Sequence, residues 1–140
     1  MGRPPLIVDA GPLYAIFDVR DARHGASREL LENYPGPLLV PMLVVAEVAY
    51  LMSTRLAPAA EIAFLGNLAS GTYLPEPVDA PDWLRIAELV ARYRDLPLGT
   101  VDASLVAAAE RLGITTVASF DRPHLSVVVP SHATGFELLP

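Results

Sequence analysis

Short apolar runs alternate with longer amphipathic stretches along this chain. Runs rich in branched aliphatic residues, of a length typical of buried strands, occupy 6–8, 38–40 and 114–118. Helical periodicity predicts helices at 13–17, 21–34, 42–55, 58–70, 79–94 and 100–112. A short strand is expected at 72–74 and an edge strand at 127–129, before a C-terminal tail. Strands that alternate with helices imply an α/β fold whose parallel sheet is covered on both faces.

Two predicted helices have distinctive faces. In the 79–94 helix, the residues expected to face the core are Trp83, Ile86, Ala87 and Val90, and those expected on the opposite face are Asp82, Arg85, Glu88, Arg92 and Asp95. The 58–70 helix is apolar around most of its circumference, which indicates cover on more than one side. We therefore expect the 42–55 and 58–70 helices to form a partner-facing surface and a homodimer.

The composition indicates one compact domain, and we take 1–140 as a single domain. The chain is 52% hydrophobic, with a mean hydropathy of +0.38, so apolar surface is expected to remain for a partner. The longest apolar stretch, 38–52, contains Pro41 and Glu47 and is too short to cross a bilayer. The N-terminal segment lacks the apolar core of a signal peptide, and there is no cysteine. We expect a cytoplasmic protein without a membrane partner.

The charge of the chain is unusual because every basic residue is an arginine and the net charge is −6. An acidic balance argues against casual nucleic-acid binding, which usually begins with an electropositive face. Carboxylates that hold a cation would inflate the negative count, however, and arginine is a good bidentate ligand for phosphate. We select Arg20 and Arg23, which follow the first helix, as candidates for substrate contact.

Four acidic residues lie at the end of, or inside, apolar runs: Asp9, Glu47, Asp102 and Asp121. A carboxylate in such a place is costly to desolvate unless it is paired or bound to a cation. In a chain without cysteine or lysine, a hard, oxygen-ligated ion such as Mg²⁺ is the natural compensator. Asp9 and Asp121 follow predicted strands, and ligands of parallel sheets gather at the carboxyl ends of strands. The leading hypothesis is therefore a magnesium-dependent active site.

Each acid also has a purely structural interpretation. Asp9 and Asp121 suit helix caps or turns, and Asp102 lies in a first helical turn, where any acid is favourable. Glu47 has apolar neighbours on its helix, which predicts burial, and its partner would be an arginine or the hydroxyl of Tyr50.

No other chemistry competes with these acids. His24, His124 and His132 are scattered, without the close pair or cysteine partners of a zinc site, so we assign them no role. The chain has neither a Gly-x-Ser-x-Gly signature nor a glycine-rich phosphate loop.

The segments around the four acids resemble the four motifs of PIN-domain nucleases. These segments are 7–13 (IVDAGPL), 44–48 (VVAEV), 99–108 (GTVDASLVAA) and 119–122 (SFDR). Their order and spacing, and the length of the chain, are similar to those of VapC-type toxins of bacterial toxin–antitoxin pairs. The third motif is the most specific of the four.

This resemblance implies a three-layer α/β/α sandwich and a Mg²⁺- or Mn²⁺-dependent endoribonuclease, which acts on RNA, is inhibited by a VapB-like antitoxin and is usually dimeric. Asp9, Glu47, Asp102 and Asp121 would form the catalytic quartet. We assign Asp9 and Asp102 to metal coordination, and Glu47 and Asp121 to orienting the surrounding waters or holding a second ion. Many members have Ser or Thr after the first acid and a second acid in the fourth motif; here Ala10 and Pro123-His124 stand there.

Three alternatives to a nuclease are considered. A receiver domain uses a lysine at its site, and this chain has none. A haloacid-dehalogenase-type phosphatase needs an acid two residues after the first, where this chain has Gly11. The remaining alternative is a catalytically inactive PIN-like module that binds RNA or protein.

Overall fold

The computed structural model describes residues 3–140, so the first two residues of the N-terminal segment lie outside the described part. A sheet of five parallel strands, in the order β3-β2-β1-β4-β5, forms its centre. The strands are β1 (Leu6–Val8), β2 (Leu38–Pro41), β3 (Leu74–Glu76), β4 (Thr116–Ala118) and β5 (Glu137–Leu139). The helices are α1 (Ala10–Phe17), α2 (His24–Asn33), α3 (Met42–Arg55), α4 (Pro58–Ser70), α5 (Ala80–Arg92), α6 (Thr100–Leu112) and α7 (Arg122–Leu125).

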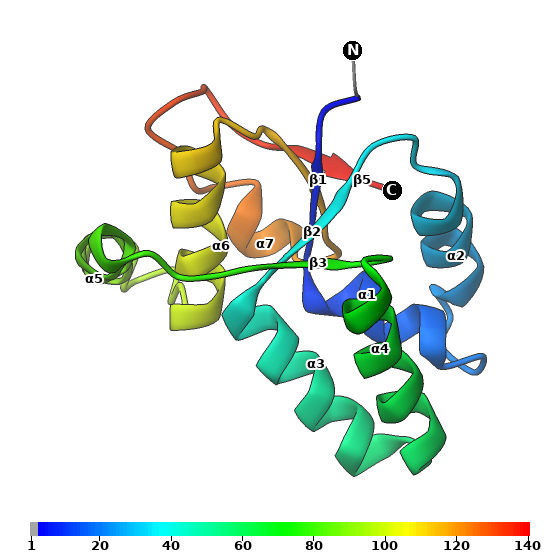
Figure 1. The fold of residues 1–140 in the computed structure, drawn as a ribbon. Helices are drawn as coiled ribbons and strands as arrows, with labels where there is room; N and C mark the ends of the chain where they lie inside the picture. The colour runs from blue at the N-terminus through cyan, green and yellow to red at the C-terminus, as the bar shows by residue number, and fades with distance from the viewer. Residues whose placement is uncertain (1–2) are drawn as a thin grey trace.

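Helices cover both faces of this sheet (Figure 1). Side chains in β1 alternate between the two faces, as the pleat requires. Leu6 and Val8 join a hydrophobic cluster with α1, α2, α3 and α4. Ile7 joins a second cluster with α5, α6 and the segment that follows β4. The predicted α/β fold with a parallel sheet between helical layers is confirmed.

The centre of the sheet is also where its connections change direction. From β1 the chain proceeds to β2 and β3 on one side, and returns through α5 and α6 to β4 on the other. Val8 pairs with Ala118, and the backbone N–H of Asp9 donates to the carbonyl of Ala118 at 2.9 Å. The carboxyl ends of β1 and β4 are therefore adjacent, at the topological switch point where parallel sheets bind ligands.

Several predicted elements have different bounds or places. The edge strand is β5, not 127–129, because the amide of Val128 donates to the carbonyl of His124 in the turn after α7. The helix predicted from Asp21 begins at His24, since the Asp21 carboxylate accepts from the amide of Arg23 in a preceding turn. The strand predicted at 72–74 lies two residues later, at β3.

The face that α5 buries also differs from the prediction. Asp82, expected to face solvent, is buried together with Ile86 and Leu89, whereas Trp83 is 51% exposed. The cause is Arg111 of α6, whose Nε lies 3.1 Å from Oδ2 of Asp82. The same guanidinium bonds Glu76 at 2.9 Å, so it joins α5 and α6 to the end of β3.

We expect Arg111→Met, which keeps the aliphatic stem, to lower the free energy of unfolding by about 3 kcal/mol, because Asp82 is left buried without its partner. Arg28→Met is the matched control. Its exposed ion pair with Glu32 should contribute no more than about 1 kcal/mol. Urea unfolding of the two variants measures both effects, and equal losses would contradict this account of the α5–α6 contact.

Candidate functional site

Asp9 stands at the switch point, directly after β1. Its carboxylate caps α1 by accepting from the amide of Ala10 at 2.8 Å. The other carboxylate oxygen accepts from the hydroxyl of Ser119 at 2.7 Å. Burial raises the pKa of Asp9, although both hydrogen bonds act to lower it, and the charge of Asp121 adds to the increase. The acid is therefore fixed in position but is costly to ionise.

Ser119 connects the two strand ends. Its hydroxyl oxygen also accepts from the amide of Asp121 at 3.0 Å, so one side chain orients both acids. Asp121 caps α7, and its Oδ1 lies 2.7 Å from Nδ1 of His124. This hydrogen bond is the main cause of the raised pKa of His124.

Asp102 lies in the first turn of α6, half-buried, and faces the other acids. Its pKa is raised to about 6, mainly by burial and then by the charges of Asp9 and Asp121, with a smaller contribution from Glu47. His124 acts in the opposite direction. Within residues 3–140, no side chain or amide forms a hydrogen bond or ion pair with the Asp102 carboxylate.

Glu47 is exposed on α3, so the predicted burial of this side chain is wrong. Its apolar neighbours Val44 and Val48 point into the core while Glu47 lies at the border of that buried stripe. Partial desolvation and the charge of Asp9 raise its pKa. In the described part of the chain neither an arginine nor the Tyr50 hydroxyl pairs with it.

The four predicted acids therefore meet around Asp102, and the structure adds a histidine to them. Ligand atoms of Asp102, Asp121 and His124 lie within 4.8 Å of one another, a spacing at which they could hold a metal ion. Two carboxylates and an imidazole suit a divalent cation, and the unbalanced negative charge at Asp102 favours one. Asp9 is not one of these three residues, but its negative charge helps to raise the pKa of Asp102.

The sequence assigned His124 no role because it has neither a nearby second histidine nor a cysteine partner. The usable signal was local. Pro123 sits in the first turn of α7, and in a helix that begins after Asp121 the residue three positions later returns to the same side.

Arg23, one of the two arginines selected from the sequence as candidates for substrate contact, lies beside this cluster. The guanidinium of Arg23 is 4.4 Å from the centroid of the Phe120 ring, between Ser119 and Asp121 in sequence. Arg85, which the sequence placed on the face of its helix opposite the core, instead forms ion pairs with Glu110 at 2.7 Å and Glu88 at 3.4 Å.

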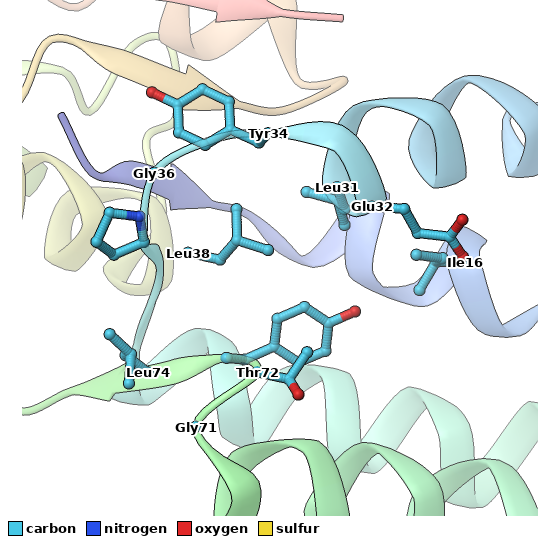
Figure 2. A pocket seen from close by; sticks show the side chains of 11 residues that line it. Ile16, Leu31, Glu32, Tyr34, Gly36, Leu38, Gly71, Thr72 and Leu74 are labelled. Atoms are coloured by element: carbon cyan, nitrogen blue, oxygen red, sulfur yellow. The ribbon is translucent and has the colours of Figure 1, made fainter. Parts of the chain in front are cut away.

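A cavity of about 460 Å³ opens at the other edge of the sheet (Figure 2). Leu38 and Leu74 in its wall begin β2 and β3, and Tyr34 follows α2. Because the strands are parallel, their amino ends lie opposite the carboxyl ends that carry the acids. The cavity is thus separate from the acidic cluster, and none of the four acids lines it.

Comparison with known proteins identifies the family to which the chain belongs. The PIN domain family model matches residues 6–128, and the chain belongs to the PIN domain family. It is 33% identical over 135 residues to Ribonuclease VapC26 of Mycobacterium tuberculosis, an alignment that covers 96% of this chain and 100% of that protein.

Solved structures show the same fold. Mycobacterium tuberculosis VapC20, described as a sarcin–ricin loop cleaving toxin, superposes with a TM-score of 0.77 and 26% identity over 83% of this chain and 89% of its own. VapBC2 from Rickettsia felis, solved bound to a promoter DNA fragment, gives 0.71 with 13% identity over 98% of this chain and 100% of its own, and so supports the fold alone. No helix within residues 3–140 is long and apolar enough to cross a membrane.

We expect Asp102→Asn to stabilise the metal-free protein at about pH 8 but not below about pH 4. The pKa of this carboxyl rises from 3.8 to about 6 on folding. Its ionisation therefore destabilises the fold above pH 6, and the penalty is absent when the acid is protonated in both states. Urea unfolding in a chelator measures the difference.

Glu29→Gln on the exposed side of α2 is the control, with the same loss of charge outside the cluster. A destabilisation by Asp102→Asn that is equal at both pH values would contradict the electrostatic account.

Proposed function

We propose that this protein is an endoribonuclease that requires a divalent cation, Mg²⁺ with Mn²⁺ as a possible substitute. The observation that carries the proposal is the convergence of Asp9, Glu47 and Asp121 around Asp102, a carboxylate without a counter-charge of its own in the described chain. The ribonuclease name of the relative that aligns over its full length supports RNA as the substrate.

The residues at the switch point would have three roles, which are metal binding, orientation of water and positioning of the acids. Asp9 and Asp102 would hold the ion, with Asp121 and His124 as further ligands on their side of Asp102. When bound, a divalent cation supplies a nucleophilic water near neutral pH and stabilises the charge on the departing oxygen. Glu47, exposed at the rim, would orient the attacking water, and Ser119 keeps Asp9 and Asp121 in position.

We further propose that the chain, as a single PIN domain over 1–140, acts as the toxin of a toxin–antitoxin pair and is neutralised by a VapB-type antitoxin. The VapC name of the 33% identical relative, and the description of the 26% identical VapC20 as a toxin, support this role. FitAcB from Neisseria gonorrhoeae superposes with a TM-score of 0.62 and 16% identity over 96% of each chain and shares the fold. Exposed apolar side chains on α3 and α4 offer the surface for dimerisation: Met42, Tyr50, Ile62 and Leu65.

Purified protein should cleave single-stranded RNA in Mg²⁺ or Mn²⁺ and lose this activity in EDTA. Asp102→Asn should reduce the rate by at least about a hundredfold, because even residues that only orient metal ligands contribute 10- to 100-fold. Glu29→Gln should keep the wild-type rate. Appearance of labelled fragments on a gel measures cleavage, and RNA binding without any cleavage would favour the inactive PIN-like module.

In solution we expect a dimer through α3 and α4. Ile62→Asp places a charge on this surface, where the wild-type side chain is 67% exposed, and should yield monomers at micromolar concentration. Val19→Asp, at a residue that is 79% exposed outside these helices, should leave the dimer intact. Light scattering of the three proteins distinguishes the cases, and a monomeric wild type would refute the predicted dimer.

A further inference from the structure

The ring of Phe120 packs against the start of α1, beside the acidic cluster. It is flanked by Ser119 and Asp121, which are tied to each other and to Asp9. A Cβ on Gly11 would come within 3.1 Å of the Phe120 ring, so the ring packs directly against the glycine backbone of α1. The missing side chain at residue 11 therefore makes room for an aromatic ring at the edge of the site.

Arg23 completes this arrangement from a distant part of the sequence. Its guanidinium lies 4.4 Å from the ring centroid, a separation at which the ring attracts the cation. Stacking on an aromatic face restricts the planar group and leaves its N–H donors at the edge free for an anion. Arg23 is exposed at the first residue before α2 and does not cap this helix with its side chain.

The charge of Arg23 is also not neutralised by a carboxylate. Ion pairs within residues 3–140 engage Arg28, Arg85 and Arg111, but not Arg23. Asp21, its nearest acidic neighbour in sequence, accepts from the backbone amide of Arg23. An unpaired guanidinium therefore stacks on Phe120, the residue directly before Asp121, in a chain of net charge −6.

We propose that Arg23, stacked on Phe120, binds a phosphate of the RNA strand next to the bond that is cut. This inference rests on the proposed function and adds to it a substrate-binding residue, Arg23, that is held in place by the Phe120 ring. The acidic cluster repels a polyanion, so a fixed cation at its rim would guide the strand to the acids. Phe120 is a positioning residue in this role, because it acts through Arg23.

The test is binding of a fluorophore-labelled, mixed-sequence single-stranded RNA of about 20 nucleotides, followed by anisotropy in EDTA between about 50 and 200 mM KCl. Arg23→Ala should weaken binding on the order of tenfold, as for a lost charge-assisted contact. It should also reduce the slope of log K against log salt by about 0.7, the value for one phosphate contact on a single strand. Arg28→Ala removes the same charge from the middle of α2, where it is paired with Glu32, and should change neither quantity.

Two further variants separate the charge at residue 23 from the stacking on Phe120. Arg23→Lys and Phe120→Leu both keep a cation at residue 23, so the salt slope should remain that of the wild type while the affinity falls severalfold. Wild-type affinity in both variants would overturn the role of stacking. Equal thermal melting of all variants establishes that the fold is retained, as expected for exposed or half-buried side chains.

The outcomes distinguish this inference from the function on which it rests. A wild type that cleaves RNA with Mg²⁺, together with an Arg23→Ala variant of unchanged affinity and slope, would overturn the phosphate contact alone. A wild type that cleaves no RNA with any divalent ion would overturn the proposed function, and the phosphate contact with it.

Discussion

Repulsion among carboxylates at the junction of β1 and β4 is the constraint on which the rest of this structure depends. Asp102 has a pKa of about 6 because burial and neighbouring acids oppose its ionisation. The fold fixes Asp9 with neutral donors, whereas the imidazole of His124 bonds the Asp121 carboxylate. Ser119 and the amide of Ala10 hold Asp9, and Ser119 also accepts from the amide of Asp121. A site stabilised in this way keeps negative charge beside a cluster of ligand atoms that could hold a metal ion.

Topology explains why acids so distant in sequence meet. Asp9 and Ser119 are 110 residues apart, yet they bond because β1 and β4 are neighbours in a parallel sheet. The chain reverses its direction across the sheet at this pair, so the loops after the two strands diverge and leave room between them. The cavity near Leu38 and Leu74 lies at the opposite edge, where no such convergence of charged groups occurs.

Local patterns predicted most of the fold and the place of the acids, whereas features set by long-range contacts could not be predicted. The strands at β1 and β2 and the helices α3, α4 and α6 follow from apolar runs and periodicity. The buried face of α5 does not, because Asp82 is held inside by a capping box with Asp79 and by its ion pair with Arg111, 29 residues away. The edge strand was similarly misplaced, since β4 pairs with 137–139, which includes Glu137, and not with the more apolar 127–129. Glu47 shows that apolar helical neighbours do not by themselves bury a side chain.

Strand β5 has a consequence for how the acidic cluster is completed during synthesis. The amide of Ser119 donates to the carbonyl of Leu139 at 2.9 Å, so the residue that orients two acids is itself anchored by a later strand. A nascent chain that has not yet released this strand from the ribosome lacks the anchor. The hydrogen bonds by which Ser119 orients Asp9 and Asp121 are therefore secured only after β5 has emerged and paired with β4.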